Sequence, residues 1–249
     1  MAHTLDVEAL EADSAAAGAE GKRTYVRRIF SEIAPRYDLL NRLLSLGIDR
    51  RWRTLALRRL GWDRAPDGTY LDLCAGTLDV GAQLSRQPGF RGRILGADFA
   101  EPMLRAGTGK APAATLAPVV ADALALPVRD RVFDGAIVAF GIRNVARLDA
   151  GLREVHRALR PGARFVILEF STPRVPLVRA AYLFYFHRIL PLIGRIISGH
   201  RTAYTYLPRS VAHFPETEAL AAAMRDAGFR DVRWESLTFG IAAIHVGTK

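Results

Sequence analysis

The sequence predicts an α/β protein with one doubly wound, mostly parallel sheet of seven strands that closes with an antiparallel hairpin. Three observations support this prediction. Short apolar strands alternate with helical stretches from residue 69 onward, which is typical of a parallel sheet with helices on both faces. A turn of small residues follows the first strand. Only residues 237–240 separate the last two strands, which is too few for a parallel crossover.

The chain begins with a segment unlike the rest. Residues 1–21 carry five acidic side chains and no Lys or Arg, a balance of −5. They are rich in Ala and contain no apolar stretch, so they are neither a signal peptide nor a transit peptide. We predict a disordered acidic tail, followed by a single domain over residues 22–249 of a cytoplasmic protein.

The domain should open with helices. Val26, Ile29, Phe30 and Ile33 repeat at helical spacing and predict a helix over residues 25–33. Residues 35–38 should form a turn, because proline disfavours a helical residue before it. Further helices are expected over residues 39–44 and 52–60. Together residues 22–62 are interpreted as a helical cap on the domain.

The first strand and the turn after it indicate a ligand crevice. Residues 69–73 form a short apolar strand, residues 75–77 a small-residue turn, and a helix opens near Val80. Free N–H groups at such a helix start face a bound nucleotide. Leu78 stands where a second glycine is expected, and its side chain could obstruct a ligand that approaches the backbone. The alternative is an ordinary turn of an unrelated α/β protein.

Strands and helices then alternate to the end of the chain. The remaining strands are expected over residues 93–97, 117–120, 135–139, 164–169, 232–236 and 241–246, with helices that include residues 102–107 and 149–159. Residues 160–162, Arg-Pro-Gly, should stop the second of these helices before the next strand begins.

Polar side chains follow the ends of successive strands, where open α/β sheets bind ligands. Asp98 lies about 20 residues after the turn and could accept both hydrogen bonds of a ribose diol, or could cap the next helix. Asp122 could accept from an adenine amino group or cap a turn. The fourth strand ends at Ala139, just before Arg143 and Asn144.

Composition excludes several classes of protein. The single cysteine, Cys74, rules out an intrachain disulfide framework and a multi-cysteine metal site, and we expect a buried, inert thiol and no metal. The formal charge is +10, so residues 22–249 carry +15. Such a charge suggests an anionic partner, although an Arg-rich genome would give the same excess. Charged residues and a proline interrupt the apolar stretch over residues 175–197, so it is not a membrane span.

Four stretches carry a resemblance to a known family: residues 34–41 (APRYDLLN), 140–145 (FGIRNV), 168–173 (LEFSTP) and 206–211 (YLPRSV). With the turn, Asp98, Asp122 and the terminal hairpin, they make the chain similar to class I S-adenosylmethionine-dependent methyltransferases of Rossmann-like fold. More narrowly, it resembles the quinone-biosynthesis C-methyltransferases that act on demethylmenaquinone and ubiquinone precursors. The resemblance covers about residues 26–245.

The resemblance implies an enzyme that methylates a carbon of a demethylmenaquinol-type prenylated quinol in menaquinone biosynthesis, with S-adenosylmethionine as cofactor. It implies that Thr77, Asp98, Asp122 and Ala123 contact this cofactor. Asp72, Gly76 and Ala139 complete the expected cofactor site. The alternatives are a ubiquinone precursor or another small molecule as substrate, or a non-catalytic binding protein of the same fold. Nucleic-acid methylation is disfavoured, because no Pro-Pro-Tyr type motif follows the fourth strand.

Three residues are the catalytic candidates. Arg143 could stabilise the phenolate of the quinol, because it stays charged and offers a planar set of donors. It could also form a structural ion pair. Asn144 could orient the ring or a water molecule, and Tyr37 could close the pocket, although both residue types also form turns and packing contacts. A water molecule, His187 or His200 could accept the proton, and the histidines could equally be structural.

Residues 173–210 are expected on the substrate side. The aromatic run at residues 182–186 is flanked by arginines, which suggests an apolar cover that admits an isoprenoid chain and touches an anionic membrane at its inner face. An ordinary buried helix is the alternative. The sequence leaves the oligomeric state open, and a homodimer is one possibility.

Overall fold

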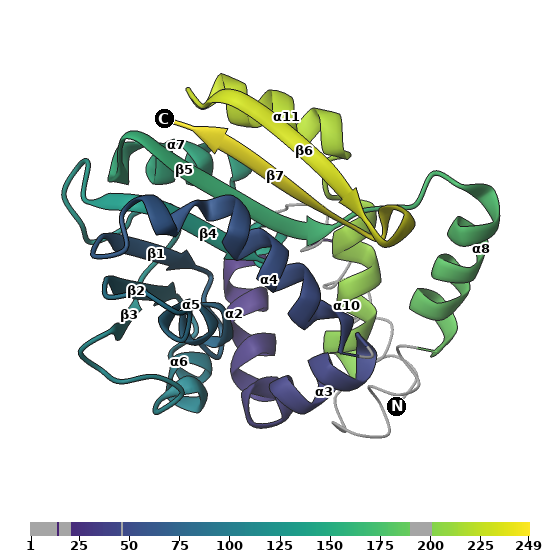
Figure 1. The fold of residues 1–249 in the computed structure, drawn as a ribbon. Coiled ribbons are helices and arrows are strands. Elements are labelled where there is room, and N and C mark those ends of the chain that lie inside the picture. Colours follow the sequence, from purple (N-terminus) through teal and green to yellow (C-terminus); the bar gives the residue numbers. More distant parts are fainter. Residues whose placement is uncertain (1–13, 15–20, 46, 190–200) are drawn as a thin grey trace.

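The computed structural model describes Ser14 and residues 21–45, 47–189 and 201–249. The predicted acidic tail, apart from Ser14 and Gly21, lies outside the described residues, and so does His200. The core is one seven-stranded sheet in the order β3-β2-β1-β4-β5-β7-β6 (Figure 1). The strands are β1 (Thr69–Leu73), β2 (Arg93–Asp98), β3 (Leu116–Val120), β4 (Phe133–Ala139), β5 (Leu159–Phe170), β6 (Arg230–Leu237) and β7 (Ala242–Thr248).

The pairing of the strands confirms the predicted fold class. The strands β1 to β5 pair in parallel, whereas β7 is antiparallel to both β5 and β6. The chain leaves β1 toward β2 and β3 and returns on the other side of β1 as β4. This reversal opens a crevice at the carboxyl ends of β1 and β4, where open sheets bind their ligands.

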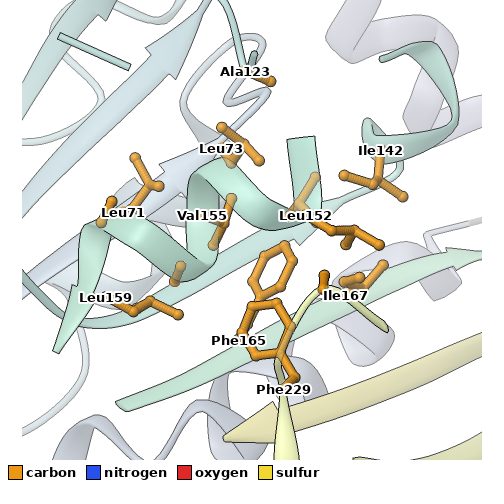
Figure 2. Packing of buried hydrophobic residues seen from close by; sticks show 14 of the residues in the cluster. Leu71, Leu73, Ala123, Ile142, Leu152, Val155, Leu159, Phe165, Ile167 and Phe229 are labelled. Atoms are coloured by element: carbon orange, nitrogen blue, oxygen red, sulfur yellow. The ribbon is translucent and has the colours of Figure 1, made fainter. Parts of the chain in front are cut away.

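Helices cover both faces of the sheet. On one face α7 (Leu148–Ala158) and α11 (Thr217–Asp226) pack against a core that includes Leu73 and Phe165 (Figure 2). On the other face α4 (Ile48–Leu60) and α5 (Asp79–Ser85) cover side chains such as Tyr70 and Val166. Successive residues of a strand point to opposite faces, so Phe165 and Val166 belong to different cores. α6 (Glu101–Gly107) packs beside β2 and β3.

The N-terminal helices are present, with one correction. They are α2 (Lys22–Ile33), α3 (Tyr37–Leu44) and α4. The predicted turn at residues 35–38 is wrong in detail: residues Ala34–Arg36 form a 3₁₀ helix, η1, with Pro35 in its first turn, and α3 starts at once at Tyr37. The first N–H groups of a helix have no partner within the helix, so the missing N–H of proline costs nothing there. The chain can therefore bend at Pro35 while it stays helical.

A second correction concerns β5. The helix α7 ends at Ala158, and the strand starts at Leu159 rather than at residue 164. Pro161 and Gly162 therefore lie inside the strand, where the pairing between β4 and β5 is irregular between Phe133 and Gly135. A strand tolerates proline and glycine at such an irregularity. The helix thus ends just before the Arg-Pro-Gly run, as predicted, and only the start of the strand differs from the prediction.

The described residues of 173–210 add helices beyond the carboxyl ends of the strands. They are α8 (Pro176–Phe184), a π-helical turn η4 (Tyr185–Ile189) and α10 (Arg201–Ala212), and α10 lies beside α2 (Figure 1). Short 3₁₀ helices complete the described elements: η2 (Trp62–Arg64), η3 (Ile142–Asn144) and η5 (Thr238–Gly240). In the described part of the chain, no helix is both long and apolar enough to cross a bilayer.

Candidate active site

The turn after β1 forms the floor of a small cavity. The N–H of Ala75 donates to the carbonyl of Ala97 at 3.0 Å, and the N–H of Leu78 donates to the carbonyl of Ala75 at 2.8 Å. Gly76 has a φ of +52°, a conformation that glycine adopts at little cost. Its N–H donates to Asp98 Oδ2 at 2.9 Å. The turn is therefore tied directly to the end of β2.

Leu78 does not obstruct this cavity. Its φ of +63° is unfavourable for leucine, at a cost of about 1–2 kcal/mol. The side chain is 2% exposed and packs in the core under α4 and α5. Two glycines make room for it: a Cβ on Gly96 would lie 2.5 Å from Leu78 Cδ2, and one on Gly107 would lie 3.0 Å from its Cγ. Burial of the side chain offsets the backbone strain.

This cavity has a volume of about 60 Å³ and brings together most of the predicted cofactor residues. Gly76, Asp98, Asp122, Ala123 and Ala139 line it, together with Phe99 of the β2 end and Phe30 of α2. We name it the cofactor cavity. Cys74 also lines it and is half-buried rather than fully buried. Burial raises the pKa of its thiol well above the usual value, as expected for an inert cysteine.

Asp98 and Asp122 each have a structural and a ligand-facing side. Asp98 Oδ1 accepts from the N–H of Ala100 at 2.8 Å, at the entry to α6, and burial raises the pKa of this carboxyl. Asp122 Oδ1 accepts from the N–H of Leu124 at 3.0 Å, and Arg23 of α2 pairs with its Oδ2 at 2.9 Å. These carboxylates therefore hold turns together and also line the cavity, while their roles toward a ribose and an adenine stay predictions.

Two predicted cofactor residues do not line this cavity. Asp72 is buried beneath the turn, where its Oδ2 accepts from the N–H of Gly81 at 2.8 Å and links β1 to α5. Burial, against the opposing effect of this hydrogen bond, raises the pKa of Asp72 to about 7. Thr77 is also buried, and its hydroxyl donates to Asp38 Oδ1 at 2.5 Å. Both residues support the turn from behind.

Thr77 belongs to a charged network that the sequence did not reveal. Lys110 donates to Asp38 Oδ2 at 2.5 Å and to Asp79 Oδ1 at 2.6 Å. Arg53 of α4 bonds to Asp79 Oδ2 at 2.9 Å and lies 3.2 Å from Asp49 Oδ2. The network fastens α3 and α4 to the start of α5. Its members are up to 72 positions apart, so no local sequence pattern marks them.

A larger cavity, of about 400 Å³, lies next to the first. We name it the substrate cavity. Tyr37, Phe30 and Phe140 line both cavities, so the two share a wall. Most of the remaining lining is apolar or aromatic and comes from α2, α4, α8, α10 and the end of the hairpin; it includes Ile29, Ile33, Ile48, Trp52, Phe170, Val178, Tyr182, Tyr185, Tyr206, Leu207 and Ile241.

Arg143 reaches the substrate cavity from a buried ion pair. Its Nη1 donates to Glu169 Oε1 at 2.7 Å and also to the carbonyl of Phe140, and its Nε donates to Ser210 Oγ at 3.2 Å. The guanidinium lies 5.6 Å from the ring centre of Phe170. Burial raises the pKa of Glu169, while Arg143 and the N–H of Phe170 act in the opposite direction. Arg143 thus forms the structural ion pair that the sequence allowed, and it also lines the substrate cavity.

The other catalytic candidates lie at the junction of the cavities. Asn144 lines the cofactor cavity, and its Oδ1 accepts from Tyr206 Oη at 3.2 Å. Burial raises the pKa of Tyr37, which is hydrogen-bonded to Asn41. The side chain of His187 and the whole of His200 lie outside the described residues. Among the described residues that line the substrate cavity, none is a histidine.

Comparison with known proteins places this geometry in context. The model of the ubiE/COQ5 methyltransferase family matches residues 18–249. A protein of Thermus thermophilus named demethylmenaquinone methyltransferase is 51% identical over 89% of this chain and 100% of its own length. A Geobacter sulfurreducens protein named ubiquinone/menaquinone biosynthesis C-methyltransferase is 46% identical over 90% of this chain and 88% of its own length.

Solved structures agree on the fold. An S-adenosylmethionine-dependent methyltransferase of Thermotoga maritima superimposes with a TM-score of 0.61 at 18% identity, covering 89% of this chain and 98% of that one. The [4+2]-cyclase SpnF gives a TM-score of 0.66 at 15% identity, covering 90% and 94%. At this identity the likeness concerns the fold alone, and the two names show that one fold serves different reactions.

Proposed function

The chain belongs to the ubiE/COQ5 methyltransferase family, and from this premise we propose that it methylates a ring carbon of a demethylmenaquinol-type prenylated quinol in menaquinone biosynthesis. As a member of that family it is an S-adenosylmethionine-dependent methyltransferase. The observation that carries the substrate proposal is the shared wall: a small cavity that contains the carboxylates of Asp98 and Asp122 meets a large aromatic cavity at Tyr37 and Phe140.

The residues of the cofactor cavity fit S-adenosylmethionine. Asp98 already accepts backbone hydrogen bonds from Gly76, Phe99 and Ala100, and a carboxylate has about four acceptor positions, so it can also accept from a ribose hydroxyl. Asp122 would accept from the adenine amino group and the Gly76 turn would hold the amino-acid part, while Ala123 and Ala139 leave space for the cofactor. When bound, the cofactor supplies a methyl group on a positively charged sulfur.

The substrate cavity suits an aromatic ring with an apolar tail. Its volume of about 400 Å³ lies in the range of sites for small organic ligands. We propose that the ring lies near Phe140 and Phe170, with one hydroxyl toward Arg143. The guanidinium would stabilise the phenolate, and a water-poor cavity would favour reaction between this anion and the sulfonium, because both charges disappear. Asn144 and Tyr37 would hold the ring in line with the methyl group.

The surface around the substrate cavity suggests peripheral membrane contact. The helix α8 lines the cavity with Val178, Ala181 and Tyr182, yet Leu177 on the same helix is 82% exposed. Phe184 of α8 and Phe239 of the hairpin are also exposed, and so are the side chains of Arg174 and Arg179. Apolar and basic side chains together favour an anionic bilayer surface. We propose that the described residues of 173–210, which leave out residues 190–200, form this entrance and that residues 22–62 form the cap.

The quinones of a deletion strain test the proposal. Mass spectrometry is expected to show that demethylmenaquinone accumulates and that the wild-type gene restores menaquinone. Accumulation of a demethylated ubiquinone precursor would instead assign the ubiquinone branch. An unchanged quinone profile would contradict the assignment to quinone biosynthesis.

A further inference from the structure

The proposed reaction requires a proton acceptor beside the quinol hydroxyl, because loss of that proton makes the adjacent ring carbon a strong nucleophile. Arg143 cannot accept it, since a guanidinium stays protonated in proteins. Glu169 is occupied by Arg143 and by the N–H of Phe170, and it does not line the substrate cavity. The acceptor must therefore be sought elsewhere on the cavity wall.

The tyrosines of the cavity are unsuitable as bases. Tyr37, Tyr182, Tyr185 and Tyr206 line it, and burial raises the pKa of each of them, for Tyr206 to about 12. They are neutral phenols at physiological pH and can donate but not remove a proton. The described lining residues include no histidine and a single carboxylate, that of Asp49.

The Asp49 carboxylate is buried but retains acceptor capacity. The residue is 8% exposed and lies in the first turn of α4. Its Oδ1 accepts from Ser45 Oγ at 2.7 Å, and its Oδ2 lies 3.2 Å from Arg53 Nη2. These two interactions use about half of the four acceptor positions of a carboxylate. Asp49 can thus also accept from a substrate hydroxyl.

Asp49 lines the substrate cavity, and Arg53 links it to the start of α5. Its partner Arg53 also binds Asp79 at the start of α5, directly behind the cofactor turn. The charge of Arg53 acts against the rise that burial causes in the pKa of Tyr37, a residue that lines both cavities. On the same helix, the ring of Trp52 lies 6.0 Å from that of Phe140 in the shared wall. A quinol ring at this wall would lie in the same cavity as Arg143, Asp49 and Arg53.

We propose that Asp49 is the general base of this enzyme, an assignment that rests on the proposed quinol substrate. Asp49 takes the hydroxyl proton next to the reacting carbon, and Arg143 and Arg53 hold the resulting negative charge. The ring carbon forms a bond to the methyl group, and the carbon–sulfur bond breaks with its electron pair on sulfur. The methylated carbon then loses its hydrogen to water as a proton, while Asp49 returns its proton to the oxygen. One proton is released in total.

The variant Asp49→Asn tests this role with purified protein, a demethylmenaquinol with a short prenyl chain, and S-adenosylmethionine. Removal of a general base is expected to lower kcat by about 100-fold or more, with the affinity for S-adenosylmethionine within about threefold of wild type by calorimetry. Asp67→Asn is the matched control, because Asp67 is exposed and paired with Arg91. Inactive wild-type protein would contradict the proposed function itself, whereas active Asp49→Asn at near wild-type kcat would overturn only the role of Asp49.

A second measurement separates a base from a structural residue. Quinols with electron-withdrawing ring substituents lose their hydroxyl proton more readily and need less help from a base. We expect the ratio of the wild-type kcat to the Asp49→Asn kcat to be at least tenfold smaller on such a substrate than on the parent quinol. A purely structural defect would lower the rates on both substrates by the same factor, and that result would overturn the proposal even if kcat falls. Thermal unfolding of both proteins checks that the variant is folded.

Discussion

At the scale of single residues, Leu78 shows how an unexpected side chain can be accommodated. A leucine with positive φ in a ligand-binding turn suggests an obstructed site. In the structure the strain is local, and the side chain points into the core between Gly96 and Gly107. The sequence shows the missing glycine after Gly76 but not the two distant glycines that compensate for it. The support that Leu78 gave to a non-catalytic binding protein therefore disappears.

Replacement of this leucine gives the first prediction. Leu78→Gly removes a buried side chain, at a cost of about 2–5 kcal/mol for comparable core truncations, but relieves about 1–2 kcal/mol of backbone strain. We expect a net loss of about 1–3 kcal/mol in urea unfolding and no change in S-adenosylmethionine affinity by calorimetry. Leu78→Ala keeps the strain and should lose more stability. A tenfold gain in affinity for Leu78→Gly would show that the leucine does obstruct the site.

The buried pair of Arg143 and Glu169 gives the second prediction. Glu169→Gln leaves the guanidinium without its charged partner, and breaking a buried pair typically costs about 3–5 kcal/mol of stability. A misplaced Arg143 should also lower kcat at least tenfold with little change in the KM for S-adenosylmethionine. Glu235→Gln breaks the exposed pair with Arg59 and should cost less than about 1 kcal/mol. Equal effects of the two substitutions would contradict the structural role of the buried pair.

Asp72 gives a prediction on pH. Its pKa is about 7 in the folded protein, against 3.8 for an ordinary aspartate. The folded state therefore binds a proton that the unfolded chain has released, and this contribution to stability is lost as pH rises from about 4 to 7. Asp72→Asn keeps an acceptor for Gly81 without the charge, so stability in urea should fall less over this pH range than in wild type. Parallel pH profiles would contradict the assignment.

At the scale of elements, local patterns predicted most of the scaffold. Short apolar runs located all seven strands, with the start of β5 five residues off, and the short connection before β7 correctly predicted its antiparallel pairing. The errors lie beside two prolines. Pro35 sits in a 3₁₀ helix that leads into α3, where a turn was expected, and Pro161 lies within β5, which starts five residues earlier than expected. The helix α7 does end before Pro161, as the Arg-Pro-Gly run predicts.

The helix α8 carries a prediction for membrane binding. Leu177→Ser together with Phe184→Ser should reduce flotation of the protein with anionic vesicles at least fivefold, because both side chains are exposed. Activity on a water-soluble quinol should remain. Val120→Ser should have no effect on flotation, because Val120 is exposed on β3, the edge strand at the other end of the sheet from the terminal hairpin. Unchanged flotation of the α8 variant, or equal binding to neutral vesicles, would contradict the proposed entrance.

At the scale of the whole molecule, the site is assembled from segments far apart in the chain. Lys22 of α2 donates to the carbonyl of Arg143 across 121 positions, and Trp52 of α4 donates to Thr238 across 186. The sequence located five of the seven expected cofactor residues on the cavity wall, because they follow strand ends that the sheet brings together. Asp49, Arg53 and Glu169 escaped notice, because only the packing of helices over the sheet makes them neighbours of the site.

The central claim is that the two cavities bring a quinol ring to the methyl group of S-adenosylmethionine. The most direct test incubates the purified protein with S-adenosylmethionine labelled with ¹³C in its methyl group and with a reduced demethylmenaquinone, followed by mass spectrometry and NMR. We expect one labelled methyl group bonded to a ring carbon. A labelled methyl group on oxygen, or an unlabelled quinol after prolonged incubation with cofactor-binding protein, would contradict this account.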